Sequence, residues 1–190
     1  ELAQNMRRYS YFSYDIHEAL HLTEQERLIL VDCLIHIQNE LQHYDEQSKY
    51  LITDYIKLVL DFCVRFYDRQ FKTRTIENHN VLARMEKLLD DYFLSSLPVQ
   101  KGLPTVQYCA DKLCLSANYL GDLVRKVTGV SALKHIHRKT LEIVKLRLDD
   151  QSKSINQISE ELGFSSPQHF NNWFKKMEGK TPNEYRIQGH

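Results

Sequence analysis

The sequence predicts an all-α fold, in which a helical hairpin is followed by a tandem helix-turn-helix domain with a long connector helix. Three observations support this fold class. Apolar residues recur at spacings of three and four through almost the whole chain, which is the periodicity of amphipathic helices. Only 6 Gly and 4 Pro interrupt these patterns in 190 residues. A helix–turn–helix pattern also occurs twice in the second half, and such internal repetition argues strongly against coincidence.

The first predicted helix begins with the capping-box pattern TEQE at residues 23–26 and runs to about Gln42. A polar break at residues 43–46 separates it from a second amphipathic helix at about 48–71. Two long helices with a short joint form an antiparallel hairpin. The apolar stripes of these helices are wider than the hairpin can bury by itself. We therefore expect self-association, as a homodimer through the helices of residues 23–71.

A third helix is expected at about residues 80–94, where it would pack on the hairpin or on the second half of the chain. Residues 95–104 follow with two prolines, one glycine and two serines, a composition typical of a hinge. A domain boundary is therefore expected between residues 1–95 and residues 96–190.

The clearest local pattern lies at about residues 154–187. Ser154 is a residue type that favours an N-cap, and Gly163 stands where the chain must leave the first helix. Ser165 or Ser166 then caps a second helix. The apolar residues of this second helix lie at spacings of three and four, which places them on one inner face: Phe170, Trp173, Phe174 and Met177.

A first copy of the same pattern lies at about residues 105–130. Up to the turn, the residue numbers of matching positions in the two copies differ by a constant amount. The second copy has one more residue at the turn, and the match then continues to the glycine that ends the second helix of each copy. A connector helix is expected at about 132–148, and the recognition helices at about 116–127 and 166–177. The matching residues of the first copy are Val106, Cys109, Ala110, Leu113, Leu115, Leu120, Leu123, Val124, Arg125, Lys126 and Gly129.

The second copy resembles the signature of AraC/XylS-type bacterial transcription regulators. The resemblance rests on Ile155, Gly163-Phe164, Phe170, Phe174-Lys175, Gly179, Thr181-Pro182 and Tyr185-Arg186, and with the first copy it covers roughly residues 104–187. It implies a DNA-binding domain, preceded by dimerising helices and by an N-terminal sensor barrel, with double-stranded DNA as partner and RNA polymerase as a potential further one. Residues 1–14 are too short for a barrel and are expected to be the tail of a removed sensor. The small-molecule effector site would then be mostly absent from this chain.

The charge is distributed in a way that fits DNA binding, although the formal net charge is zero. Residues 1–98 hold 11 Lys and Arg against 16 Asp and Glu, a balance of −5, and residues 99–190 hold 14 against 9, a balance of +5. A DNA-binding region needs a surplus of positive charge to neutralise phosphates, and the half with this surplus is the half that contains both helix-turn-helix copies. We therefore expect residues 1–95 to form a dimerisation and linker region, and residues 96–190 to form the DNA-binding domain.

Outward-facing polar residues on the second recognition helix are the main candidates for DNA contact. Gln and Asn side chains recognise adenine through paired hydrogen bonds, and Lys side chains neutralise phosphates. A solvated polar face is the simpler alternative. The candidate base contacts are Gln168, Asn171 and Asn172, with His169 for a base edge or a phosphate, and the candidate phosphate contacts are Lys175, Lys176 and Lys180.

The first recognition helix carries a weaker set of candidates. Asn118 and Tyr119 could contact bases, whereas Asp122 repels phosphate unless it accepts a hydrogen bond from a cytosine amino group. Gly121 offers no side chain at all. Arg125 and Lys126 would contact the DNA backbone. These residues predict that the two copies contribute unequally and that the second dominates.

Other functional classes have little support in the sequence. The four cysteines form no CxxC pair and are interpreted as reduced core thiols, which fits a cytoplasmic protein. The histidines lack the spacing of a metal site, and no nucleophile with a base or phosphate-binding glycine loop occurs, so we expect no enzyme, metal or cofactor. No continuous apolar segment is long enough to span a membrane. The prediction is a sequence-specific transcriptional regulator, favoured as an activator; the alternative is a protein-interaction module whose DNA binding is weak or vestigial.

Overall fold

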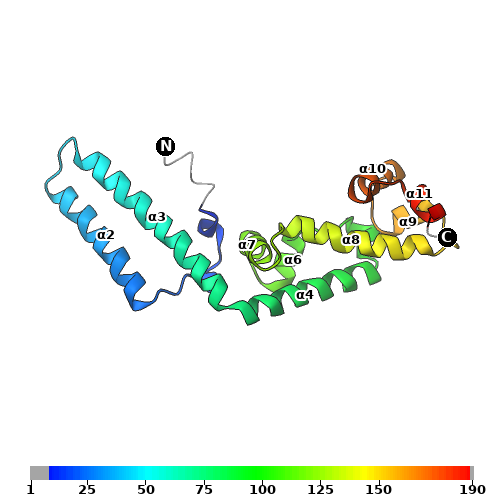
Figure 1. Ribbon diagram of the computed structural model, residues 1–190, viewed down its shortest axis with the longest axis horizontal. Coiled ribbons are helices and arrows are strands. Elements are labelled where there is room, and N and C mark those ends of the chain that lie inside the picture. Colours follow the sequence, from blue (N-terminus) through cyan, green and yellow to red (C-terminus); the bar gives the residue numbers. More distant parts are fainter. Residues whose placement is uncertain (1–8, 189–190) are drawn as a thin grey trace. The chain divides into compact units, whose positions relative to one another are not determined.

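The computed structural model describes residues 9–188, and in this range it contains helices and no strand (Figure 1). The all-α prediction is confirmed. Residues 1–8 of the expected sensor tail lie outside the described residues, and residues 9–18 contain two short 3-10 helices, η2 (Ser10–Ser13) and η3 (Ile16–Glu18). None of the helices described between residues 9 and 188 combines the length and hydropathy of a membrane span. The α-helices are α2 (Glu24–Gln42), α3 (Ser48–Thr73), α4 (Thr75–Leu94), α5 (Leu97–Lys101), α6 (Val106–Leu113), α7 (Ala117–Thr128), α8 (Ala132–Asp149), α9 (Ile155–Glu161), α10 (Pro167–Glu178) and α11 (Pro182–Gln188).

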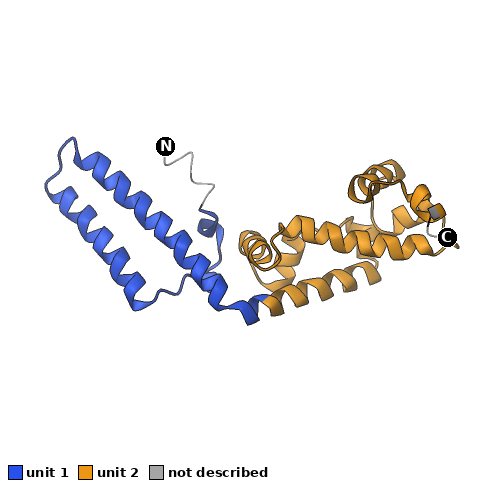
Figure 2. Cartoon of the chain, viewed as in Figure 1, with its two compact units in different colours: residues 1–78 blue, residues 79–190 orange. Residues whose placement is uncertain are grey.

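The chain divides into two compact units, residues 1–78 and residues 79–190 (Figure 2). This division falls inside α4, upstream of the boundary expected near residue 95. The helix predicted at 80–94 begins at Thr75, and the segment expected to be a hinge contains α5. Hydrogen bonds account for the order in this segment. The Tyr92 hydroxyl donates to the Gly102 carbonyl at 2.8 Å, and the Gly102 N–H donates to the Pro98 carbonyl at 2.8 Å.

The N-terminal unit is the predicted hairpin, with α2 and α3 side by side (Figure 1). The capping box at the start of α2 is confirmed, because Thr23 accepts from the Glu26 N–H at 3.3 Å and Glu26 accepts from the Thr23 N–H at 2.8 Å. The segment before α2 is fastened to α3 by two side chains. Gln70 accepts from the His21 N–H at 2.8 Å, and Arg69 donates to the His21 carbonyl at 2.6 Å.

The C-terminal unit contains both helix-turn-helix copies at the places the repeat predicts. In the first copy, Thr105 and Ser116 cap α6 and α7 through their side chains. In the second copy, Ser154 and Ser166 cap α9 and α10 in the same way. The N-cap serines of the two recognition helices are therefore repeat-equivalent, and Ser166 rather than Ser165 starts the second one.

The turn inside each copy is built around a residue with positive φ. Gly163 in the second copy has φ +78°, and Cys114, its equivalent in the first copy, has φ +57°. The left-handed conformation favours glycine, so Cys114 is an unusual residue for this position. The Leu115 and Phe164 N–H groups then donate to Ala110 and Ser159 across the two turns, at 2.9 and 3.0 Å.

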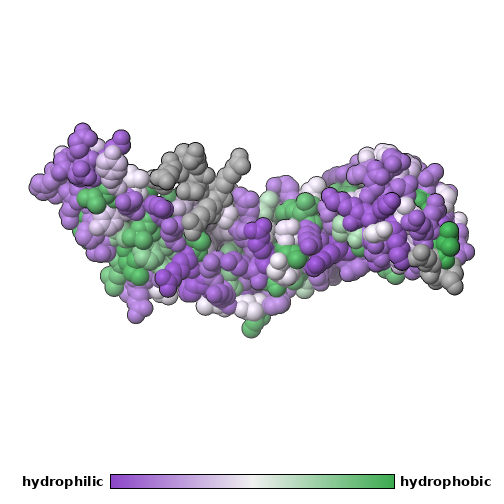
Figure 3. All heavy atoms as spheres, turned by 45° about the horizontal axis from the view of Figure 1, so that its top comes forward, coloured by the Kyte–Doolittle hydropathy of each residue, from purple (hydrophilic) through white to green (hydrophobic). Residues whose placement is uncertain are grey.

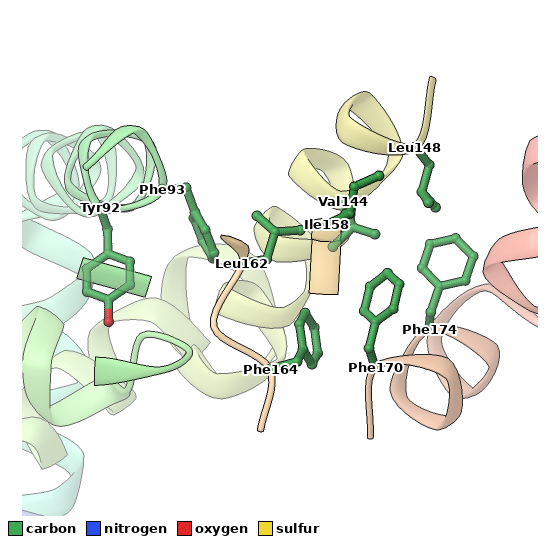
Figure 4. Packing of buried hydrophobic residues seen from close by; sticks show 9 residues of the cluster. All are labelled: Tyr92, Phe93, Val144, Leu148, Ile158, Leu162, Phe164, Phe170 and Phe174. Atoms are coloured by element: carbon green, nitrogen blue, oxygen red, sulfur yellow. The ribbon is translucent and has the colours of Figure 1, made fainter. Parts of the chain in front are cut away.

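Aromatic residues from several helices form the core around the second copy. Phe170 and Phe174 of α10 are fully buried, and Phe164 packs edge-on against Phe170 with ring centroids 4.9 Å apart (Figure 4). Tyr92 and Phe93 of α4 belong to the same cluster. The other buried members are Val144 and Leu148 from α8 and Ile158 and Leu162 from the α9 region. The second copy is thus held by its own helices and by α4 and α8 together.

Candidate nucleic-acid interface

The second recognition helix, α10, places its apolar side inward and its polar side outward. Ser166 accepts a hydrogen bond from the His169 N–H at 3.1 Å, and Pro167 occupies the first turn, where its missing N–H costs little. Gly179 ends the helix with φ +83°, and its N–H donates to the Lys175 carbonyl at 2.9 Å. These local features fix the direction of the helix, and the buried Phe170 and Phe174 fix its rotation.

The candidate base contacts on α10 lie at or near the solvent-facing surface. Gln168 and Asn172 are exposed, and Asn171 is half-buried. The Gln168 Nε2 donates to the Asn172 Oδ1 at 3.3 Å, so the two amides lie next to each other along the helix. Each of these amides carries one donor and one acceptor group, the combination with which a single Gln or Asn side chain can bind an adenine edge.

His169 lies at the start of α10 beside the turn. Its Nδ1 lies 3.0 Å from the Ser165 hydroxyl oxygen, and its ring meets the Phe164 ring at 5.8 Å between centroids. The side chain is nevertheless exposed. The structure thus combines the two interpretations of the sequence, because His169 covers the turn and remains accessible to a ligand.

The lysines form the basic end of α10. Lys175 and Lys176 are exposed in the last turn, where their charge also complements the helix dipole, and Lys180 is exposed just beyond the helix. Cations at this place can contact phosphates on the flank of a groove.

His137 on α8 is a neighbour of this surface that the sequence did not indicate. Its ring meets Trp173 edge-on at 6.0 Å between centroids. Burial, and then the positive charge of Lys176, lower the pKa of His137 below its usual value. The sequence pattern gave no signal for this contact, since it depends on how α8 and α10 cross.

The first recognition helix, α7, presents fewer polar groups. Asn118, Arg125 and Lys126 are exposed, and Asp122 is half-buried. Tyr119 is only 7% exposed and lies with the buried residues of the helix. The expectation that Tyr119 contacts bases is therefore not supported, because its ring is part of the protein interior. Gly121 adds nothing to the outer face, and a Cβ built on it would meet no atom within 4 Å.

One group of side chains could be considered for a metal ion. Among the residues that the structure describes, Asp15, His17 and Glu18 bring one potential ligand atom each within 4.8 Å of one another. Glu18 accepts a hydrogen bond from the Asp15 N–H at 2.7 Å, as part of a capping box around η3. The capping box explains this cluster without an ion.

Comparison with known proteins finds bacterial transcription regulators that are similar to this chain. A family profile described as a helix-turn-helix domain matches residues 109–188. The chain is 37% identical over 81 residues to the uncharacterized transcriptional regulatory protein YesN of Bacillus subtilis, covering 40% of this chain and 21% of that protein. It is 27% identical over 152 residues to the melibiose operon regulatory protein of Escherichia coli, covering 78% of this chain and 50% of that protein. The chain therefore spans half or less of the length of these two regulators.

A solved structure also matches part of the chain. It is that of a transcriptional regulator from Chromobacterium violaceum, described as an AraC-type DNA-binding domain-containing protein. The match has 29% sequence identity and a TM-score of 0.41, and it covers 45% of this chain and 76% of that structure.

Proposed function

Residues 109–188 form a helix-turn-helix domain of the AraC type, and from this premise we propose that the chain activates transcription by binding a specific DNA site in the cytoplasm through both copies. The observation that carries the proposal is the outer face of α10. It presents the adjacent amides of Gln168 and Asn172, which suit a base edge. Lysines follow in its last turn, where they suit the flanking phosphates.

The second copy should supply most of the affinity. Its candidates are three amides, a histidine and three lysines, whereas the first copy offers Asn118, Arg125 and Lys126 beside the half-buried Asp122. A carboxylate close to phosphates costs affinity unless it accepts a hydrogen bond from a base. Both copies have complete N-caps and buried cores, so the difference lies in their surfaces.

The exposed apolar face of the hairpin supports a homodimer. The only residue of α2 that is fully buried is Cys33, although the helix carries Leu28, Val31 and Ile35 at spacings of three and four. Leu28 is 54% exposed and Ile35 is 48% exposed. Apolar surface gathers over this hairpin (Figure 3). A second hairpin packed on this face would complete a four-helix arrangement and remove these side chains from water.

Sedimentation of the wild type and of two α2 variants tests the dimer. Leu28→Glu places a charge in the proposed interface and should make the protein monomeric at micromolar concentrations, at which the wild type should be a dimer. Gln25→Glu adds the same charge at an exposed position of α2 outside the stripe of Leu28, Val31 and Ile35, and should leave the dimer intact. A monomeric wild type at these concentrations would refute dimerisation by the hairpin.

The DNA-binding proposal is tested by selecting bound sequences from random duplexes and then measuring affinity across a salt series. Two enriched motifs about one helical turn apart would support binding by both copies. If about six phosphates are contacted, affinity should fall roughly a thousandfold between 50 and 200 mM salt. Failure to enrich any motif, with weak and salt-insensitive binding, would favour the alternative of a protein-interaction module.

A further inference from the structure

Helix α4 lies alongside the connector helix α8 and is joined to it by a carboxylate–histidine contact and by an ion pair. Glu86 on α4 lies 3.2 Å from His135 on α8, and Asp90 on α4 lies 2.9 Å from Lys139 on α8. Both partners advance by four residues from one pair to the next, so the two helices run in the same direction over this turn. Asp90 also raises the pKa of Lys139, mainly through their hydrogen bond.

Farther along, α4 joins the core of the second copy. Tyr92 and Phe93 are buried in the cluster that contains Phe170 and Phe174 (Figure 4). The chain then folds back through α5, which contacts α9. The Pro98 carbonyl oxygen lies so near Gly163 that a Cβ added there would be 2.2 Å from it. The segment from Glu86 to Pro98 is therefore fixed to α8 at one end and to the turn of the second copy at the other.

This arrangement bears on the connector. α8 has 18 residues and is about 27 Å long at 1.5 Å per residue, while successive major grooves on one face of DNA lie about 34 Å apart. Ile136 and Thr140 are buried in its first half, and the helix contacts α6 and α7 of the first copy. Val144 and Leu148 in its second half belong to the core cluster of the second copy. A helix between two small bodies can bend, and side-chain contacts with a second helix alongside it oppose that bending. α4 supplies the second helix.

We propose that the segment from Glu86 to Pro98, here named the α4 brace, fixes the two recognition helices relative to each other and so makes the protein select the spacing between its two half-sites. The inference rests on the proposed function in that both α7 and α10 must contact DNA. A change of one base pair turns a half-site by about 34° and shifts it by about 3.4 Å, which a rigid pair of recognition helices cannot follow. Glu86 and Asp90 are positioning residues, because they act through α8.

The rigidity of the brace can be measured without DNA. One nitroxide is attached to the exposed native Cys114 in the first copy and another to an Asn183→Cys substitution on α11, in a Cys63→Ser background; Cys33 and Cys109 are buried. Pulsed dipolar spectroscopy then gives the distance distribution between the two copies. Asp90→Lys places two cations opposite each other and should broaden this distribution. Asp90→Lys combined with Lys139→Asp restores an ion pair and should narrow it again.

Asp91→Lys is the matched control, because Asp91 is the exposed neighbour of Asp90 and the change in charge is the same. It should leave the distribution as in the wild type. A distribution that Asp90→Lys does not broaden, or that Asp91→Lys broadens equally, would overturn the brace. Since this measurement needs no DNA, it remains decisive even if the proposed function fails.

The consequence for specificity is measured with duplexes that carry the two selected half-sites at the preferred spacing and at spacings one base pair shorter or longer. The wild type should lose about tenfold in affinity at the altered spacings, roughly the effect of one lost base contact. Asp90→Lys should lose less than threefold, and the swapped pair should regain the tenfold discrimination. Equal binding by the wild type at all three spacings would refute selection by the brace, while specific binding to the second half-site alone would still support DNA recognition.

Discussion

Gly163 makes the closest backbone approach among the glycines of the described chain, and replacing it tests the packing of the second copy. Its φ of +78° lies in the left-handed region, and a Cβ built on it would be 2.2 Å from the Pro98 carbonyl oxygen and 2.7 Å from the Pro98 carbonyl carbon. Both atoms belong to the backbone, so no side-chain rotation relieves the clash. Gly163→Ala therefore requires α5 to move away from the turn.

The expected loss has two parts. The left-handed conformation costs an alanine about 1–2 kcal/mol, and displacement of a packed neighbour costs about 1–3 kcal/mol more. Gly179 separates the two parts, because its φ is +83° and a Cβ there would meet no atom within 4 Å. Gly179→Ala should cost only the conformational part. The difference between the two variants should thus be about 1–3 kcal/mol, a large share of the stability of an ordinary domain.

Urea unfolding followed by tryptophan fluorescence measures this difference, because Trp173 is the only tryptophan in the chain and lies 5.2 Å from Phe164 between ring centroids. Gly163→Ala should unfold at a clearly lower midpoint than Gly179→Ala, with the same slope. Unfolding free energies that agree within about 0.5 kcal/mol would refute the reasoning, since surface substitutions alone produce differences of that size.

Three further predictions concern the DNA surface and its neighbours. Asp122→Ala should weaken binding to the selected site if Asp122 accepts from a base, and should strengthen it if the carboxylate only repels phosphate; an anisotropy titration that shows no change would exclude both roles. Lys176→Ala should weaken binding to all sequences alike and reduce the salt slope by about 1, a result that a sequence-dependent loss would contradict. His137 has a lower pKa in the folded chain than in the unfolded chain, so its neutral form favours folding. The wild type should therefore lose stability relative to His137→Gln as the pH falls below about 6.5, as followed by thermal unfolding; parallel pH profiles would refute this.

The sequence predicted the scaffold of the second half well because its signals are local. N-cap serines, a glycine at the turn and apolar residues at helical spacing each act within one or two turns of chain. Ser116 and Ser166 cap the two recognition helices, and the helices end within a residue of their predicted bounds. The left-handed conformation of Cys114 was not predicted, because a cysteine is not a residue type that indicates this conformation. Its alignment with Gly163 in the repeat did indicate a left-handed residue at this position.

The parts that were not predicted depend on contacts between segments distant in sequence. Residues 95–104 have the composition of a hinge, yet Pro98 and Gly102 are ordered by Tyr92 and by the close approach to Gly163. Tyr119 was expected outside because the repeat aligns it with His169, a polar residue that helical spacing assigns to the outer face. For a side chain at the edge of a helix face, helical periodicity gives the direction only within a few tens of degrees. A tyrosine ring at such an edge is stabilised by packing inward, because this buries its large apolar surface. The burial of Tyr119 therefore follows from its own chemistry.

The divergence between Tyr119 and His169 shows what the repeat conserves within this chain. Caps, turn and core recur in both copies, while the outer residues differ, so the scaffold of the first copy is intact and its recognition surface is poor. Linking a weak contact to a strong one makes the weak contact intramolecular, and its effect then depends on how well the linker geometry matches the two sites. If the α4 brace fixes that geometry, even the few groups of α7 add discrimination at the correct spacing. If the connection between the two copies were flexible, the same groups of α7 would add affinity for any neighbouring DNA, which would reduce specificity.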